Sequence, residues 1–237
     1  MAQLEPAWTY RTGEVPVGGE GHIVVPLQVD GMLYGCTHTS RLFAVDSETG
    51  EEIWTFDPDA EGNIFPRCRG VIYYDTNADQ SPAERDGDVE TLDVDALCSR
   101  RIISSTVDAR LVAVDALTGE PCAEFGENGI FDLRNGMGEI KTGYYFQTSS
   151  PTVGRGLIVI GGWVHDNAEV GEPSGVIRAF DARTAELVWA WDLGDPSITL
   201  LPPPGESYSR GTPNVWSTMS YDDTLGLVYL PVGNATP

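Results

Sequence analysis

The chain has 237 residues, of which 36 are Asp or Glu and 14 are Lys or Arg, so its formal net charge is −22. A surface this acidic repels phosphate backbones, which argues against nucleic acid as a partner. Hydrophobic residues make up 41% and charged residues 21%, so general disorder is excluded as well. The apolar runs are shorter than the roughly 20 residues of a membrane helix, and residues 1–6 lack the basic and apolar regions of a signal peptide. We therefore expect neither a membrane-spanning helix nor a signal peptide in this sequence.

A repeated pattern of strands and turns runs along the chain. Residues 42–56, 111–125 and 177–191 each predict a β-hairpin, in which alternating apolar residues lead into an Asp-x-x-Thr turn and a second strand. The Asp and Thr side chains can hydrogen-bond the turn amides, and the Gly that follows in two copies tolerates a positive φ. The third copy has Ala185 at that position, and the second has Ala123 where the others have a tryptophan.

A further short strand is predicted before each hairpin, in residues 31–36, 102–106 and 157–162. A repeating strand–strand–turn–strand unit is typical of a propeller blade, and an open meander or solenoid of hairpins is the alternative. A fourth unit begins at 218–237. Because propellers close with about 4 to 8 blades, we predict one all-β propeller domain over 1–237, present as an incomplete arc of about three to four blades. Missing blades or self-association would cover its open edges.

The four cysteines, Cys36, Cys68, Cys98 and Cys122, show neither the CxxC spacing nor the neighbouring His pair of a zinc site. We expect free thiols within strands. A single disulfide of undetermined pairing is the alternative in an oxidising compartment.

Six motifs follow one another along almost the whole chain: 7–13 (AWTYRTG), 33–37 (LYGCT), 68–71 (CRGV), 148–151 (TSSP), 174–181 (SGVIRAFD) and 229–233 (YLPVG). Together they resemble the quinoprotein dehydrogenases that use pyrroloquinoline quinone (PQQ), in the membrane-bound glucose and quinate dehydrogenase branch. The resemblance implies an eight-bladed propeller, of which this chain is the N-terminal portion. It also implies that PQQ lies in the axial funnel beside Ca²⁺ or Mg²⁺.

The resemblance assigns several residues to the cofactor. Arg69 would donate hydrogen bonds to the quinone oxygens, Thr148 and Ser149 would hold a cofactor carboxylate, and Trp216 would stack beneath the ring. The alternatives are a surface ion pair for Arg69 and ordinary turn formation for the two hydroxyl residues.

The resemblance also assigns oxygen ligands to the metal ion, as a hard cation requires. Asp166 is the family's metal carboxylate and also borders the cofactor, with Asn167 as its helper. Asn234 and Thr236 are the further candidates, of which one should face the metal. An Asx-turn in a loop is the alternative for Asp166.

The sequence departs from the family pattern near the substrate. His38 falls one position before the family's histidine at the funnel mouth, and Thr39 stands at the aligned place. Ile23 replaces a glutamate near a cofactor carboxylate, for which Glu20 is a possible substitute.

The resemblance places the family's catalytic aspartate in a later blade, downstream of Pro237, together with a lysine that contacts the quinone. We therefore expect no catalytic residue among residues 1–237. We also expect the chain to be inactive on its own.

The resemblance implies oxidation of a sugar, polyol or cyclic polyol by the full-length protein, with electrons passing to ubiquinone or a cytochrome. It also implies a periplasmic, membrane-associated location. The rival hypothesis is a non-catalytic propeller scaffold, such as an outer-membrane assembly protein with similar repeats.

Overall fold

A computed structural model describes residues 4–15, 23–62, 66–77 and 96–235, and all regular secondary structure in this part of the chain is β-strand. Three four-stranded sheets contain neighbouring antiparallel strands in chain order. The first contains β1 (Leu27–Val29), β2 (Met32–Cys36), β3 (Leu42–Asp46) and β4 (Glu52–Phe56). The second contains β5 (Ile72–Asp75), β6 (Arg100–Ser105), β7 (Arg110–Asp115) and β8 (Ile130–Asp132).

The third sheet contains β10 (Thr152–Gly154), β11 (Leu157–Ile160), β13 (Ile177–Asp181) and β14 (Leu187–Trp191). The predicted fourth unit is present as the pair β15 (Ser220–Asp222) and β16 (Leu227–Tyr229). A small extra sheet pairs β9 (Tyr145–Phe146) with β12 (Trp163–Val164). Hairpins β3–β4 and β13–β14 lie where residues 42–56 and 177–191 predict them, and β15–β16 lies within the predicted fourth unit. The second copy differs from the prediction: β7 pairs with β8 beyond the range 111–125, and inside that range only an isolated bridge joins Val114 to Pro121. The last two residues of the predicted fourth unit, Thr236 and Pro237, lie outside the described residues.

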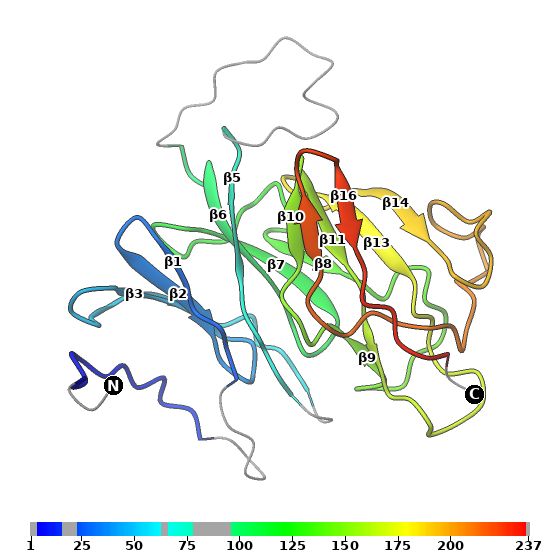
Figure 1. Ribbon diagram of the computed structural model, residues 1–237, viewed down its shortest axis with the longest axis horizontal. Helices are drawn as coiled ribbons and strands as arrows, with labels where there is room; N and C mark the ends of the chain where they lie inside the picture. Colours follow the sequence, from blue (N-terminus) through cyan, green and yellow to red (C-terminus); the bar gives the residue numbers. More distant parts are fainter. Residues whose placement is uncertain (1–3, 16–22, 63–65, 78–95, 236–237) are drawn as a thin grey trace.

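The sheets lie side by side in chain order and form an arc (Figure 1). The first strand of each sheet contacts the first strand of the next, from β1 to β5, from β5 to β10 and from β10 to β15. The first strands therefore gather along a common axis, as the inner strands of propeller blades do.

Each Asp-x-x-Thr turn closes through the aspartate side chain. In the first sheet Asp46 Oδ1 accepts hydrogen bonds from the amides of Glu48 (2.9 Å) and Thr49 (2.8 Å) and from the Thr49 hydroxyl (2.9 Å). The amide of Thr49, followed by its hydroxyl and the Glu48 amide, holds the pKa of Asp46 below its ordinary value. The same bonds recur at Asp115 and Asp181.

The turn of one sheet is held by a side chain from the sheet before it. Trp54 of β4 donates from Nε1 to the carbonyl of Ala116 (3.0 Å), in the turn of the second sheet. Trp8 makes the equivalent bond to Ser47 in the first sheet (3.2 Å).

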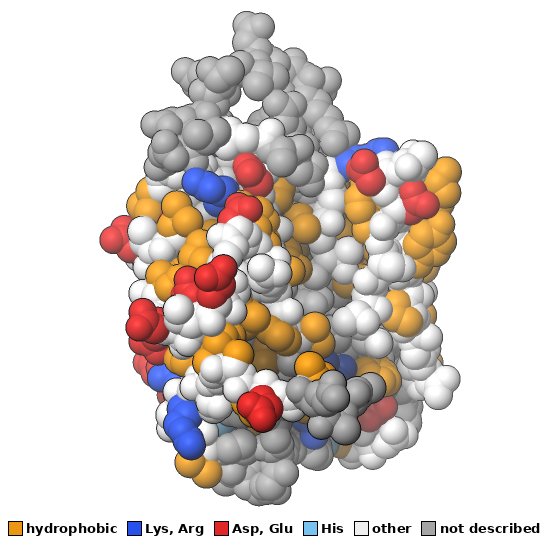
Figure 2. Space-filling model, turned by 60° about the vertical axis from the view of Figure 1, so that its left-hand side comes forward, with side chains coloured by type: hydrophobic (Ala, Val, Ile, Leu, Met, Phe, Trp, Pro, Cys, Tyr) orange, Lys and Arg blue, Asp and Glu red, His pale blue; other side chains and the backbone are white. Residues whose placement is uncertain are grey.

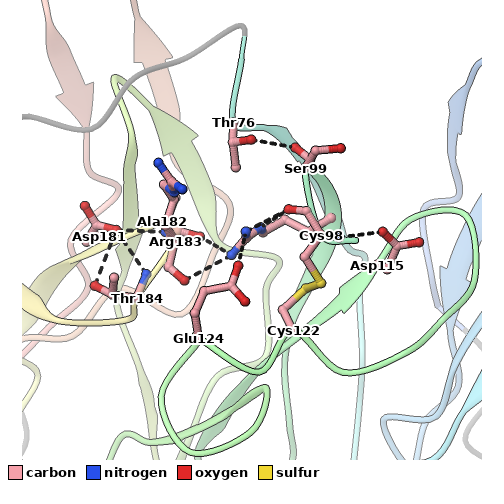
Figure 3. Close-up of polar contacts among 11 residues, drawn as sticks. Thr76, Cys98, Ser99, Asp115, Cys122, Glu124, Asp181, Ala182, Arg183 and Thr184 are labelled. Carbon is pink, nitrogen blue, oxygen red and sulfur yellow. Dashed lines mark hydrogen bonds and ion pairs between the residues drawn. A yellow bond between two sulfur atoms is a disulfide. The ribbon is translucent and has the colours of Figure 1, made fainter. Parts of the chain in front are cut away.

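At the boundary between the second and third sheets, Ala123 stands where the other copies have a tryptophan, so no indole is available to make this contact. The fully buried Arg101 of β6 makes it instead. Its guanidinium donates to the carbonyls of Ala182 (3.4 Å) and Arg183 (3.0 Å), in the turn of the third sheet, and to Glu124 (2.6 Å). Figure 3 shows this turn, closed by Asp181 and Thr184, facing Glu124 and the Cys98–Cys122 pair of the second sheet.

The expectation of free thiols was wrong. Cys36 is bonded to Cys68 and Cys98 to Cys122, with Cα atoms 5.9 and 5.6 Å apart. The first disulfide joins the end of β2 to the segment before β5, and so connects two sheets. Sequence spacing contains no information on such contacts between sheets, which is why this pair was missed. The second disulfide lies within one sheet, between the segment before β6 and the connection from β7 to β8.

We predict that Gly119→Ala destabilises the fold by about 2–4 kcal/mol. Gly119 has φ +76°, and an added Cβ would lie 2.8 Å from the Trp54 ring, so backbone strain and overpacking add. Urea unfolding measures the loss. The matched control is Gly31→Ala, where φ is +80° but nothing lies within 4 Å, and we expect about 1–2 kcal/mol there. Equal losses in the two variants would contradict the role of the Trp54 contact.

Candidate functional site

A cavity of about 390 Å³ lies among the connections at one end of the sheets. Because neighbouring strands are antiparallel, this end is opposite the Asp-x-x-Thr turns. The cavity is lined by Arg67, Arg69, Thr148, Trp163, Val164, Asp166, Asn214 and Trp216. The structure thus brings together four residues that were predicted separately from the sequence: Arg69, Thr148, Asp166 and Trp216.

The segment before β5 presents two arginines to this cavity. Arg67 and Arg69 both line it, whereas Cys68 between them is buried and bonded to Cys36. In extended chain, alternate residues point to opposite sides. The disulfide therefore anchors one side of the segment and leaves both guanidiniums on the other. Arg67 was missed in the sequence, although the Arg-Cys-Arg alternation would have indicated it once the cysteine was known to be buried.

Arg69 lies against the exposed indole of Trp216, with Cζ 5.6 Å from the ring centroid. Burial, followed by the positive charge of Arg67, lowers the pKa of Arg69. The two guanidiniums thus repel each other in a partly buried site, and an anionic ligand would relieve that repulsion. Arg69 and Trp216 form a cationic and aromatic surface suited to a flat anionic molecule.

Thr148 and Ser149 fix the backbone beneath this surface. Both hydroxyls donate to the carbonyl of Trp216, at 2.9 and 2.8 Å. Thr148 lines the cavity, and Ser149 lines a small neighbouring void of about 10 Å³. A hydroxyl has one proton to donate, so either group would have to turn away from Trp216 to bind a ligand carboxylate.

Asp166 lines the cavity from the loop after β12, and it is exposed, as is Asn167 beside it. Asn167 adopts a positive φ of 59° and does not line the cavity. The loop is held by Glu172, whose fully buried carboxylate accepts the amides of Ala168 (2.6 Å) and Glu169 (3.0 Å). Glu172 therefore fixes the backbone that presents Asp166.

The segment before β15 repeats the alternation seen before β5. Asn214 and Trp216 line the cavity, and Val215 between them is buried in the core. The Asn214 carbonyl accepts the amide of Gly233 (2.8 Å), which brings residues 231–235 next to the cavity.

The structure does not place the C-terminal metal candidates, Asn234 and Thr236, at the cavity. Asn234 follows Gly233, but it is exposed and does not line the cavity. Thr236 lies outside the described residues, as does Pro237, the residue after which the catalytic aspartate was expected. The expectation of a base downstream of Pro237 therefore stays a prediction.

His38 and Thr39 do not line the cavity. His38 is buried against Glu14, with Nδ1 and Oε2 3.1 Å apart, and the same carboxylate lies near Arg41 (3.4 Å). Thr39 is exposed on the turn between β2 and β3. Glu20 lies outside the described residues, and Ile23 is 43% exposed.

Within the described ranges, no three His, Cys, Asp or Glu side chains form a cluster that could hold a metal ion. Asp166 is the single carboxylate of the cavity lining, so protein ligands to a cation would otherwise be amide, hydroxyl or carbonyl oxygens. The described part of the chain also has no helix of the length and apolarity that crossing a bilayer requires.

The family model described as "PQQ: Glucose/ethanol/alcohol dehydrogenase, beta-propeller domain" matches residues 1–237. The quinate/shikimate dehydrogenase (quinone) of Acinetobacter baylyi is 37% identical over 100% of this chain and 30% of its own length. The quinoprotein glucose dehydrogenase of Escherichia coli is 39% identical over 99% of this chain and 29% of its own. The chain thus spans about 30% of the length of these relatives.

Solved structures agree with the architecture. The quinohemoprotein alcohol dehydrogenase of Comamonas testosteroni has a TM-score of 0.64 and 26% identity over 92% of this chain and 30% of its own. A europium-containing methanol dehydrogenase has a TM-score of 0.66 and 20% identity over 97% of this chain and 38% of its own, which shows a shared fold. The predicted all-β propeller class, present as an open arc, is confirmed.

We predict a non-additive effect of removing the two hydroxyls beneath Trp216. In Thr148→Val or Ser149→Ala the other hydroxyl still satisfies the Trp216 carbonyl, so each single variant loses about 0.5–1 kcal/mol. The double variant leaves the carbonyl without either donor, and we expect about 1 kcal/mol of extra loss. Urea unfolding of the four proteins measures this coupling, and strictly additive losses would contradict it.

Proposed function

Since the chain belongs to the PQQ family of glucose, ethanol and alcohol dehydrogenase β-propellers, we propose that it forms part of a dehydrogenase that binds PQQ in the Arg69–Trp216 cavity. The substrate is a sugar, a polyol or a cyclic polyol. The family match favours this function over the scaffold hypothesis. The relatives named for quinate/shikimate and for glucose are almost equally similar to this chain, at 37% and 39% identity, so identity does not separate acidic from neutral substrates.

The single observation that supports this proposal most is the convergence of Arg69, Thr148, Asp166 and Trp216 on one cavity. PQQ is a flat ring system with three carboxylates and an ortho-quinone. An exposed indole and neighbouring guanidinium groups are what a planar polyanion requires. When bound, PQQ would supply the two-electron acceptor for alcohol oxidation.

The residues assigned to the cofactor then each have a proposed role in binding it. Trp216 supports the ring from one face, and the Thr148 and Ser149 hydroxyls fix the backbone of Trp216. Arg69 would donate hydrogen bonds to the bound cofactor's quinone oxygens and would stabilise negative charge there. Asn167 would assist Asp166, its neighbour in the loop after β12, in holding the cofactor. The base that would take the substrate proton is proposed to lie in another blade of the full-length protein.

The proposed metal ion is Ca²⁺ or Mg²⁺, bound beside PQQ. Asp166 supplies a carboxylate at the cavity, and Asn234 or Thr236 supplies a further oxygen, the donor type that both cations prefer. Glu172 serves this site indirectly because its bonds to Ala168 and Glu169 hold the loop that presents Asp166.

Electrons leave through ubiquinone or a cytochrome, and the name of the Acinetobacter baylyi relative specifies a quinone for that protein. The remaining blades of the propeller are the other partner. We place the full-length protein in the periplasm, associated with the membrane, and the two disulfides fit such an oxidising compartment.

The proposed function is tested by titrating the protein with PQQ in the presence of Ca²⁺ or Mg²⁺ and following quenching of tryptophan fluorescence. We expect saturable quenching, and affinity lower by about 10- to 100-fold in Arg69→Gln, because a charge-assisted hydrogen bond is lost. Trp216→Leu is expected to weaken binding through loss of ring contact.

The control is Arg134→Gln, since Arg134 is exposed, pairs with Asp132 and lies outside the cavity lining. This variant should bind PQQ as the unaltered protein does. Equal affinity in Arg69→Gln and Arg134→Gln, or no saturable quenching at all, would contradict the proposed site.

A further inference from the structure

The Cys36–Cys68 disulfide connects the cavity lining to the first sheet. Cys68 lies between two residues that line the cavity, Arg67 and Arg69. Cys36 is the last residue of β2, a strand that pairs with β1 on one side and with β3 on the other. Cys68 also packs in the core shared by the first two sheets, but apolar packing is non-directional. The covalent bond to β2 is therefore the contact that fixes the place of this segment.

Apart from this bond, few contacts fix the Arg69 side chain. Its guanidinium lies over the Trp216 ring, with Cζ 5.6 Å from the centroid, and forms neither a hydrogen bond nor an ion pair with the part of the chain that the structure describes. The Arg69 carbonyl accepts the amide of Val25 (2.8 Å), but Val25 is 71% exposed and precedes β1. The guanidinium can thus donate to a ligand, and its position depends on the backbone beside Cys68.

The charge of the chain makes the position of this cation important. Asp and Glu side chains are scattered over the face shown in Figure 2, with fewer Lys and Arg. The net charge of −22 opposes the approach of PQQ, which carries three carboxylates. A cation held in the binding geometry before the ligand arrives stabilises the complex more than one that must be ordered on binding. Cofactor affinity should therefore depend on what holds Arg69 in place.

We propose that Cys36 and Cys68 are positioning residues for the cofactor, because their bond holds Arg69 where its guanidinium can donate to the quinone oxygens of PQQ. The inference rests on the proposed function and adds the requirement of an intact disulfide to the same site. In the oxidised protein the segment is tied to β2, and Arg69 is ordered before PQQ binds. Once the bond is removed, binding includes the entropic cost of ordering the segment, so PQQ affinity falls.

The second disulfide, Cys98–Cys122, provides a matched control. The Cys98 amide donates to Asp115 Oδ2 (2.7 Å), so this disulfide lies beside an Asp-x-x-Thr turn, at the end of the sheets opposite the cavity. Neither of its cysteines lines the cavity. The two bonds close loops of similar length, with sequence separations of 32 and 24. Their removal should therefore lower the stability of the fold by similar amounts.

The test compares the unaltered full-length protein containing this chain with two double variants, Cys36→Ala/Cys68→Ala and Cys98→Ala/Cys122→Ala. PQQ is titrated in the presence of Ca²⁺ or Mg²⁺, and quenching of tryptophan fluorescence gives the affinity. We expect Cys36→Ala/Cys68→Ala to bind PQQ about 10-fold more weakly, because the charge-assisted hydrogen bond from Arg69 is no longer prearranged. Cys98→Ala/Cys122→Ala should bind PQQ as the unaltered protein does, although urea should unfold both variants more easily.

A second measurement tests whether the disulfide acts through Arg69. Arg69→Gln is added to the unaltered protein and to each double variant. In the unaltered protein and in Cys98→Ala/Cys122→Ala it should lower PQQ affinity by about 10- to 100-fold. In Cys36→Ala/Cys68→Ala its effect should be about 10-fold smaller, since residues that act together are not additive. An equal effect of Arg69→Gln in all three proteins would overturn the inference.

Chemical reduction provides an independent test if Cys36→Ala/Cys68→Ala does not fold. In Cys98→Ala/Cys122→Ala the Cys36–Cys68 bond is the remaining disulfide of residues 1–237. Tris(2-carboxyethyl)phosphine converts it to two thiols: the disulfide gains two electrons and two protons, and the phosphine takes up the oxygen atom of a water molecule. The phosphine is removed before PQQ is added. We expect PQQ affinity to fall about 10-fold on reduction and to recover on reoxidation.

Unchanged PQQ affinity after loss of the Cys36–Cys68 bond would overturn the inference and leave the proposed function intact. An equal loss of affinity in the two double variants would also overturn it, because the disulfide would then act only through the stability of the fold. Failure of the unaltered protein to bind PQQ would overturn the proposed function, and the inference with it.

Discussion

The contact between each sheet and the turn of the next is the constraint on which this structure depends. A short antiparallel sheet cannot bury both faces alone, so it must stack on neighbours. Trp54 makes this contact from the first sheet to the second, and Arg101 makes it from the second to the third. At the opposite end of the sheets, the connections between strands form the cavity.

Side chains alternate between the two sides of an extended segment, and this alternation explains which residues face the cavity. The segments before β5 and β15 each have a buried central residue, Cys68 in one and Val215 in the other. Their neighbours on both sides consequently point into the cavity. The site is therefore built from anchored backbone, and the hydroxyls of Thr148 and Ser149 add a third anchor at Trp216.

The repeat pattern predicted the first and third hairpins, the strands before each turn and the start of the fourth unit, because Asp-x-x-Thr turns and alternating apolar residues are local signals. It placed the second strand of the middle copy too early, since β7 pairs with β8 at Ile130–Asp132. The Cys36–Cys68 disulfide could not be predicted, since it joins residues that meet only after two sheets stack. For the same reason the role of Arg101 was hidden, although Ala123 marked the place where an indole was missing. The resemblance to the family identified four of the cavity residues, but Arg67 and Asn214 became visible only when Cys68 and Val215 were seen to be buried.

An experimental structure of the full-length protein with PQQ bound is the most direct test of this account. It should show the PQQ ring lying against the face of Trp216, with the Arg69 guanidinium within hydrogen-bond distance of a quinone oxygen. A PQQ molecule bound elsewhere, or a Trp216 indole turned away from the ring, would contradict the claim that the stacked sheets build this cavity for the cofactor.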